Sequence, residues 1–341
     1  MKVGLIGART SGRSTLFEAL TGRPPSPGGK GQLGIARVMD DRLDRLTELC
    51  QPRRTVHAEV VLSLPPSPPA GAVEIAALRE ARDLKAYAHV VGAFSCAAAV
   101  DVVPAAMREL STELLLADME RVETRQTRIG KGGNARTRED ELLTRARACL
   151  DRERPLRLEP WDEQLALLMD ELGLVSHRHL ITVVNVAEDQ LGAGCPAPVA
   201  AAARETGGEV MWLCATLEAE IAALGTAEEQ REFLAAYGLS RPVSQRFVQT
   251  AFALLDQICF FTVGSDEVRA WPVARGTAAR RAARTIHSDL ERGFIRAEVI
   301  SYPDFVQHGS EARCKAAGVL RTEGKDYVVQ DGDIITVRFN V

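Results

Sequence analysis

The octapeptide GARTSGRS, Gly7 to Ser14, decides the fold of this chain. It matches the phosphate-binding pattern G-x-x-x-x-G-K-[ST] at both glycines and at the serine, but Arg13 stands where the pattern has lysine. KVGLIG (2–7) is a short apolar run that predicts a buried strand, and STLFEALTG (14–22) predicts helical turns that stop at a glycine. This order of strand, loop and helix points backbone N–H groups and a helix N-terminus at phosphate oxygens. The alternative is a tight strand–helix turn that binds nothing.

Length and composition describe an ordinary soluble globular protein. The 341 residues suit two or three domains, and a net charge of −4 argues against a globally basic nucleic-acid binder but permits a local basic patch. The start is too short and too glycine-broken for a signal peptide, and no apolar run approaches the roughly 18 residues of a membrane span. Seven scattered cysteines without a C-x-x-C pair fit reduced thiols. We therefore expect a cytoplasmic protein with no membrane partner.

The groups that hold Mg²⁺ in a hydrolysing P-loop enzyme are missing from their expected places. AEVVLSL (58–64) predicts a strand that should lead into an aspartate, but PPSPPAG (65–71) follows it. Four prolines do not form the usual D-x-x-G turn. RPPSPGGKGQLG (23–34) contains no switch threonine, and Ser26 is its only hydroxyl. Ser14 remains as a candidate Mg²⁺ ligand. Both segments are also consistent with Pro/Gly loops that carry no chemistry.

A second nucleotide signal follows another predicted strand. HLITVVN (179–185) predicts a buried strand that ends in NVAE, Asn185 to Glu188. In many nucleotide-binding proteins such an asparagine braces the P-loop, and the carboxylate three residues later accepts from the edge of the base. Asparagine and glutamate also follow strands without this role, so the motif gains weight only together with the P-loop. EVMWLCA (209–215) predicts a further strand that ends in small residues.

The segment from Pro104 to about Leu158 predicts two helices. In the first, apolar residues fall near one face: Met107, Leu110, Leu114, Ala117 and Val122. EDELLTRARACLDRE (139–153) predicts the second helix, after a glycine-broken link. Around this link lie five basic residues with no acidic residue among them, here called the basic tip: Arg125, Arg128, Lys131, Arg136 and Arg138. The basic tip is a candidate nucleic-acid contact, and a solvated hairpin end is the alternative.

The C-terminal stretch predicts a small α+β module. A strand pair is expected within 257–273, across the turn GSDE. TAARRAARTIHSDL (277–290) predicts a helix with Thr277 as candidate N-cap. Further strands are predicted at FIRAEVI (294–300), DYVVQ (326–330) and DIITVRFNV (333–341). This order of elements could form a β-grasp-like sheet.

These segments strongly resemble the C-terminal TGS domain of the YchF/Obg-like ATPases. The likeness lies in FFTVGSDEVRAWPVARGT, IHSDLERGFIRAEVI and LRTEGKDYVVQDGDIITVRFNV, within residues 257–341. It extends through the chain at STLFEALTG, DDRLDRLTELCQPRR (40–54), STELLLADMERVETR (111–125) and NVAE. The resemblance implies an α/β fold: a Ras-like P-loop domain (1–104 and 178–256), a helical, partly coiled-coil insert (105–177) and an α+β TGS domain of β-grasp type (257–341).

The resemblance also implies a site and its ligands. The residues expected to line the phosphates are Thr10, Ser11, Gly12, Arg13, Ser14 and Thr15. Asn185 and Glu188 would face adenine, because in that family the glutamate of N-x-x-E accompanies a preference for ATP over GTP. ATP or GTP is therefore the expected cofactor. The family is cytosolic and associates with ribosomes and RNA, which are the expected partners.

Departures from the family pattern concern hydrolysis. Arg13 replaces the lysine, the D-I-A-G metal motif expected near Leu64–Ser67 is missing, and a shortened proline segment replaces glycine-rich switch II. His57 and His89 flank that segment, and we assign no catalytic residue. Arginine can still donate bidentately to phosphate, although its planar fork is larger than an ammonium group.

Three functions follow from these departures. We favour a nucleotide-binding, ribosome- or RNA-associated factor with impaired or absent hydrolysis. A true ATPase that works with the unusual Arg13 is one alternative, and an interaction scaffold without nucleotide is the other. No oligomeric state is predicted.

Overall fold

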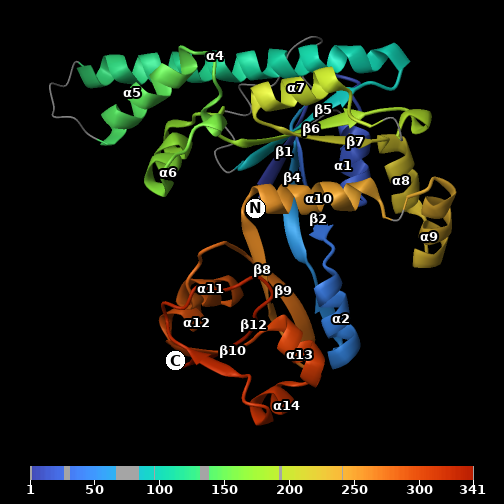
Figure 1. Cartoon of the computed structure of the whole chain (residues 1–341), viewed down its shortest axis with the longest axis vertical. Coiled ribbons are helices and arrows are strands. Elements are labelled where there is room, and N and C mark those ends of the chain that lie inside the picture. Colours follow the sequence, from blue (N-terminus) through green and yellow to red (C-terminus); the bar gives the residue numbers. More distant parts are fainter. Residues whose placement is uncertain are drawn as a thin grey trace. The chain divides into compact units, whose positions relative to one another are not determined.

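A computed structural model describes residues 2–26, 31–66, 84–95, 97–130, 138–191, 194–239 and 241–340. The chain forms two compact units, each with its own sheet and helices (Figure 1). Unit 1 comprises Met1–Ala36 and Val61–Phe247, and unit 2 comprises Arg37–Val60 and Val248–Val341. Within the described residues, no helix is both long enough and apolar enough to cross a membrane.

The first sheet has the strand order β2–β4–β1–β5–β6–β7 in the described part of the chain. Its strands are β1 (Lys2–Ile6), β2 (Gln32–Val38), β4 (Ala58–Leu64), β5 (Ala86–Gly92), β6 (His179–Asn185) and β7 (Glu209–Leu213). β1 pairs in parallel with β4 and β5, and β5, β6 and β7 continue in parallel. The predictions of β1, β4, β6 and β7 are confirmed. The sequence analysis missed β2 and β5.

Unit 1 also contains helices in its described part. They are α1 (Arg13–Thr21), α4 (Val103–Gly130), α5 (Arg138–Leu150), α6 (Glu163–Leu172), α7 (Ala197–Thr206), α8 (Ala215–Ala223), α9 (Ala227–Ala236) and α10 (Val243–Leu254), with short 3₁₀ segments η1 (Ala97–Val102), η2 (Leu156–Leu158) and η3 (Glu188–Gln190). As predicted, α1 stops at Gly22, whose left-handed conformation (φ 64°) lets its N–H donate to the Glu18 carbonyl. α10 runs from unit 1 into unit 2.

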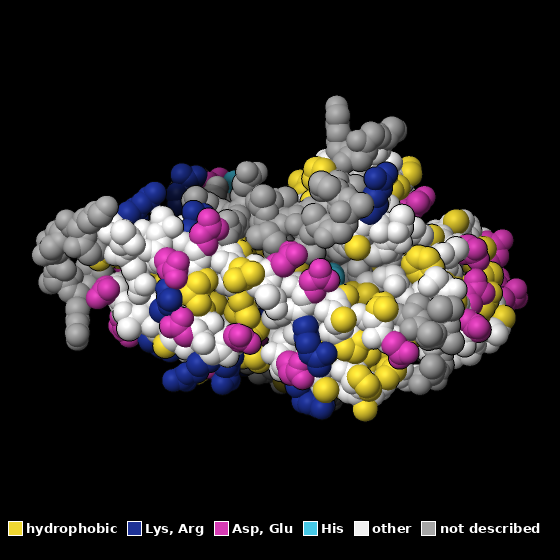
Figure 2. Space-filling view, turned by 90° about the horizontal axis from the view of Figure 1, so that it is seen from above, with side chains coloured by type: hydrophobic (Ala, Val, Ile, Leu, Met, Phe, Trp, Pro, Cys, Tyr) yellow, Lys and Arg dark blue, Asp and Glu magenta, His cyan; other side chains and the backbone are white. Residues whose placement is uncertain are grey.

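The long helix α4 contributes to the sheet core and to the helical layer. All five apolar positions predicted for one face are buried. Met107 packs with residues of β5 and β6, Leu110 and Leu114 pack with Tyr87 of β5, and Val122 packs with α5 and α6. Figure 1 shows α4 beside α7 and α5, and Figure 2 shows apolar side chains among acidic and basic ones on the face seen from above. The predicted insert thus shares its core with the sheet of unit 1.

The second sheet has the order β11–β10–β12–β8–β9–β3 among the described strands. Its strands are β3 (Arg54–Val56), β8 (Gln257–Thr262), β9 (Glu267–Ala274), β10 (Phe294–Ile300), β11 (Arg321–Glu323) and β12 (Ile334–Phe339). β8 and β9 form the predicted antiparallel pair, whereas β12 pairs with β8 in parallel. The helices of unit 2 are α2 (Asp41–Cys50), α11 (Ala279–Ile286), α12 (Ser288–Arg292), α13 (Tyr302–His308) and α14 (Glu311–Ala316).

Two local predictions in unit 2 are wrong. DYVVQ (326–330) is not a strand: Val328 makes only an isolated bridge to Ala278, and the short strand of this region is β11. Thr277 is not the N-cap of α11, because Ala278 occupies that position and the Thr277 hydroxyl donates to the Ala274 carbonyl (2.6 Å) in the turn after β9. The cysteines that the structure describes are all free.

Residues 37–60 pack in unit 2, although the sequence analysis placed them in the P-loop domain. β3 pairs in parallel with β9. Arg42 of α2 bonds Asp40 (2.8 Å) and Asp331 (2.9 Å), and its guanidinium lies 5.4 Å from the centre of the Phe261 ring. Burial alone would lower the pKa of Arg42, but the hydrogen bonds and charges of the two aspartates raise it above its ordinary value. This ion-pair network joins segments that are distant in the sequence.

Replacing Arg42 should therefore destabilise unit 2. We expect Arg42→Met to lower the free energy of unfolding by about 2 kcal/mol, because two carboxylates lose their partner. The matched control is Arg45→Met, whose ion pair with Glu48 is half exposed and should contribute at most about 1 kcal/mol. Urea unfolding of both variants checks this prediction. Equal losses in the two variants would contradict it.

Candidate functional site

The loop between β1 and α1 has a shape that its glycines make possible. Gly7 (φ 145°) and Gly12 (φ 98°) have backbone conformations that other residues rarely adopt. A Cβ at Gly7 would lie 2.3 Å from the Val90 carbonyl oxygen, and a Cβ at Gly12 would lie 2.1 Å from Nδ2 of Asn185. Both glycines of the sequence pattern are therefore required by close packing as well as by conformation.

Asn185 fixes this loop to the carboxyl end of the sheet. Its Nδ2 donates to the Ser11 carbonyl (3.0 Å), and its Oδ1 accepts from the Ala215 N–H (2.9 Å). Its own carbonyl accepts from the Ala93 N–H (2.7 Å). Asn185 is buried, so these bonds are shielded from water. The hydrogen bond to Ser11 is the brace that the sequence predicted.

A hollow of about 240 Å³ opens at the N-terminus of α1. Six of the predicted site residues line it: Thr10, Gly12, Arg13, Ser14, Thr15 and Asn185. The N–H groups of a first helical turn and the positive end of the helix dipole favour an anion at such a place. The hollow is smaller than the roughly 300–1,000 Å³ of whole-ligand pockets, so it suits the phosphate end of a nucleotide. The sequence analysis missed Arg9, Phe94 and Thr216, which also line it.

Arg13 lies in the position of the P-loop lysine with its cation shielded from solvent. It is the first residue of α1 and is only 5% exposed. It already makes a polar or electrostatic interaction within the chain, so a phosphate would have to share or replace that interaction. Its guanidinium can donate two parallel hydrogen bonds to phosphate oxygens. Ser14, the next residue, is exposed at the start of the helix.

Glu188 lies apart from the phosphate hollow, on the exposed turn η3 that follows β6. The Tyr237 hydroxyl donates to its Oε2 (3.3 Å), and the Tyr237 ring packs against Phe233 of α9 (5.3 Å between ring centres). The sequence analysis missed Tyr237, because no motif spacing joins it to NVAE. The carboxylate is thus oriented by a residue from another helix and keeps Oε1 for a further partner.

Carboxylates for a metal ion are missing from the described end of β4. The strand ends at Leu64, followed by Pro65 and Pro66, and the rest of the proline segment lies outside the described residues. No group of three or more His, Cys, Asp or Glu side chains that could hold a metal occurs in the described ranges. Ser14 is therefore the one predicted Mg²⁺ ligand that the structure places beside the phosphate hollow.

Acidic neighbours partly compensate the basic tip. Arg125 pairs with Glu139, and Arg138 pairs with Asp162 (3.2 Å). No acidic residue lies between 125 and 138, but these two carboxylates come from just outside that stretch, so the structure does not leave Arg125 and Arg138 uncompensated. Arg128 is exposed near the end of α4. Lys131 and Arg136 lie outside the described residues.

A second hollow of about 370 Å³ adjoins the same loop. Ser11 lines this hollow together with His89 of β5. The Ser11 hydroxyl and His89 Nδ1 are buried, and neither has a hydrogen-bond partner in the described part of the chain. Burial lowers the pKa of His89 to about 4, so its imidazole is neutral at neutral pH.

The whole chain is similar to known proteins. A family model described as "YchF-GTPase_C: Protein of unknown function (DUF933)" matches residues 257–340. The "Ribosome-binding ATPase YchF" of Bacillus subtilis (strain 168) is 35% identical over 370 residues, covering 100% of both chains. The protein of the same name from Haemophilus influenzae is 34% identical over 364 residues, covering 100% of this chain and 99% of that protein.

Solved structures show the same fold. The YchF GTPase of Schizosaccharomyces pombe matches with a TM-score of 0.85 and 25% identity, covering 99% of this chain and 97% of the other. A GTP binding protein from Pyrococcus horikoshii OT3 matches with a TM-score of 0.52 and 18% identity, over 100% of both chains. At this identity the match shows similarity of fold alone. The predicted fold, a P-loop α/β domain with a C-terminal TGS domain, is confirmed.

The lowered pKa of His89 predicts a pH dependence of stability. The unfolded chain binds a proton first as the pH falls, because the folded-state pKa of about 4 lies below the ordinary 6.5. This contribution to stability is present above pH 6.5 and is lost between 6.5 and 4. Between pH 7 and pH 5 the wild type should lose about 2 kcal/mol more than His89→Leu. Urea unfolding of both proteins across this range tests it, and a constant difference between them would refute it.

Proposed function

The chain belongs to the YchF family, and we propose that it binds nucleotides with a preference for ATP over GTP, hydrolyses them slowly or not at all, and associates with the ribosome. The observation that supports the proposal is the loop between β1 and α1, which its glycines and the hydrogen bond from Asn185 shape around a hollow at a helix N-terminus. The relatives named ribosome-binding ATPases match over essentially their whole length, which supports the same partner and a cytoplasmic location.

In this proposal the phosphates lie at the start of α1. Backbone N–H groups of the first turn and the Arg13 guanidinium donate to phosphate oxygens. The Ser14 hydroxyl is the protein ligand available to Mg²⁺. Mg²⁺ in such sites is usually held by one or two carboxylates together with phosphates and water. Because the described end of β4 offers no carboxylate, the residues present fit a weakly held ion carried mainly by the nucleotide.

We assign recognition of the nucleotide base to Glu188. A carboxylate accepts a hydrogen bond from the exocyclic amino group of adenine, whereas guanine presents a carbonyl oxygen at the same place and would be repelled. The Tyr237 hydroxyl holds Oε2 of Glu188, which leaves Oε1 for the base. This arrangement supports the preference for ATP.

We expect isothermal titration to show tighter binding of ATP than of GTP. Glu188→Gln should remove most of this preference, because an amide can donate to the guanine carbonyl as well as accept from adenine. Asp189→Asn, at the exposed neighbouring acid on the same turn, is the matched control and should keep the preference. GTP bound tenfold more tightly than ATP by the wild type would contradict the assignment.

Hydrolysis should be far slower than in a relative with an intact site. Each missing group that stabilises the transition state typically costs about 10²- to 10³-fold in rate. Single-turnover hydrolysis by this chain and by the Bacillus subtilis relative measures the difference. Arg13→Lys alone should not restore the rate, since the carboxylate for the metal is still missing. Equal rates in the two proteins, abolished here by Ser14→Ala, would favour a working ATPase instead.

The basic tip is the proposed ribosome contact. Arg125 and Arg138 pair with carboxylates at partly or fully exposed positions, and such pairs are worth at most about 1 kcal/mol, so phosphate can displace them. No aromatic residue lies between 125 and 138, which argues for backbone contacts without sequence preference. Exposed arginines on α11 offer a second basic surface in unit 2: Arg280, Arg281 and Arg284.

Sedimentation with ribosomes tests this contact. A variant with all five residues of the basic tip changed to Gln should bind more weakly, and its binding should depend less steeply on salt, because fewer counterions are released. The three α11 arginines changed to Gln provide the comparison. Equal binding by the wild type and the tip variant across a salt series would remove the tip from the interface.

A further inference from the structure

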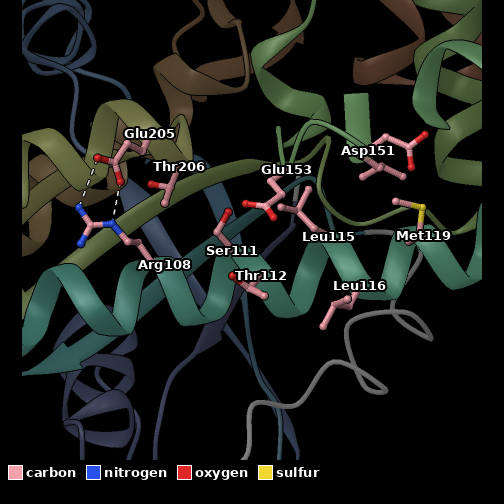
Figure 3. Close-up of a pocket in the computed structure, with 11 residues that line it drawn as sticks. Arg108, Ser111, Thr112, Leu115, Leu116, Met119, Asp151, Glu153, Glu205 and Thr206 are labelled. Atoms are coloured by element: carbon pink, nitrogen blue, oxygen red, sulfur yellow. Dashed lines mark hydrogen bonds and ion pairs between the residues drawn. The ribbon is translucent and has the colours of Figure 1, made fainter. Parts of the chain in front are cut away.

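A hollow of about 570 Å³ lies in unit 1 between α4, the end of α7 and the turn after α5 (Figure 3). We call it the α4 groove, and its lining does not include the P-loop, Asn185 or Glu188. Its volume is within the roughly 300–1,000 Å³ typical of ligand pockets. The proposed nucleotide site therefore leaves this groove without a role.

Two rows of side chains on α4 form one wall of the groove. Ser111, Leu115 and Met119 are spaced by four residues, and so are Thr112 and Leu116. Residues at this spacing lie above one another on one face of a helix. Leu116 is 64% exposed, and Leu115 and Met119 are only partly buried. The groove thus presents an apolar strip along α4.

The opposite edge of the groove is acidic. The Glu153 carboxylate has no ion pair or hydrogen bond among the described residues. Asp151 pairs with Arg147 (2.8 Å), and Glu205 pairs with Arg108 (2.7 Å). These two carboxylates are compensated by their arginines, so Glu153 carries the uncompensated negative charge of the lining. In Figure 3 Glu153 lies over the apolar strip, near Ser111 and Leu115.

Ser111 contributes a hydroxyl group to the lining of the groove. The residue is 7% exposed and lines the groove, and no hydrogen bond of its hydroxyl is found within the described part of the chain. Thr127 of the same helix and Thr144 of α5 instead donate to the carbonyl four residues earlier. The Ser111 hydroxyl is therefore available to a ligand that enters the groove.

We propose that the α4 groove binds a short extended segment of a partner protein that carries a leucine-like side chain two residues from a lysine or arginine. In an extended chain, residues two apart point to the same side, about 7 Å apart. The apolar side chain would cover Leu115, Leu116 and Met119, and the cation would pair with Glu153. A backbone group of the segment would bond the Ser111 hydroxyl.

Charge and lining favour this partner over others. A nucleic acid would be repelled by the uncompensated Glu153 carboxylate, and no aromatic side chain lines the groove to stack with bases. A small amine could pair with Glu153 but would leave the exposed strip around Leu116 uncovered. A peptide with both a cationic and an apolar side chain can pair with Glu153 and also cover the apolar strip on α4.

The test uses full-length protein and a fluorescein-labelled peptide, GLSKGLSKG, with binding followed by anisotropy. Glu153→Gln and Leu116→Gln should each weaken binding about threefold, as expected for a single exposed pair or a partly exposed contact. Matched controls are Glu171→Gln and Leu167→Gln, an exposed acid and an exposed leucine on α6, which should bind as the wild type does. Peptides with serine for leucine or glutamine for lysine should bind more weakly than the parent peptide.

Several outcomes would overturn the proposal. These are equal affinity of the wild type and both groove variants, equal losses in the controls, and displacement of the peptide by free lysinamide as effectively as by unlabelled peptide. Weaker binding of labelled polyuridine by the groove variants would indicate a nucleic-acid surface and would also overturn it. ATP titration of Glu153→Gln should match the wild type, so a failure here is distinguishable from a failure of the nucleotide site.

Discussion

The two hydrogen bonds of the Asn185 side chain hold together the parts of the chain that form the proposed nucleotide site. One bond reaches the loop after β1, and the other reaches the start of α8 after β7. A typical buried bond contributes about 1 kcal/mol, but leaving its partner unsatisfied costs about 1–3 kcal/mol. The same amide approaches Gly12 so closely that any side chain there would collide with it. The glycine and the asparagine, 173 positions apart, therefore constrain each other.

Binding and hydrolysis depend on different parts of this site. Anion binding needs the loop shape, the N–H groups of α1 and a cation, and the chain keeps all three, with Arg13 in place of lysine. Hydrolysis also needs an acidic residue at the end of a neighbouring strand to hold the metal ion. In this chain β4 is followed by prolines instead. A chain that loses only the groups needed for hydrolysis can still change its conformation or its partner when it binds a nucleotide. This is the basis of the proposed function.

The sequence predicted those elements whose signal is local. Apolar runs located β1, β6 and β7, and a glycine in a left-handed conformation marked the end of α1. β5 was missed although AYAHVVG is buried, and DYVVQ was taken for a strand because its valines favour one. β11, with the sequence RTE, carries no apolar pattern and forms only because β10 offers an edge. The contacts Tyr237–Glu188 and Arg125–Glu139 depend on the tertiary fold, so no local spacing reveals them.

The pairing of β3 with β9 has a consequence for how the chain is made. Unit 2 needs Arg37–Val60 as well as Val248–Val341, and about 190 residues separate the two stretches. At 5–20 residues per second, the first stretch leaves the ribosome roughly 10–40 s before its partners begin to emerge. During this interval β3 lacks β9, and Arg42 lacks Asp331. Unit 1 can therefore fold while Arg37–Val60 still lacks its partners. Until the C-terminal strands are synthesised, β3 must not pair with the edge of another sheet.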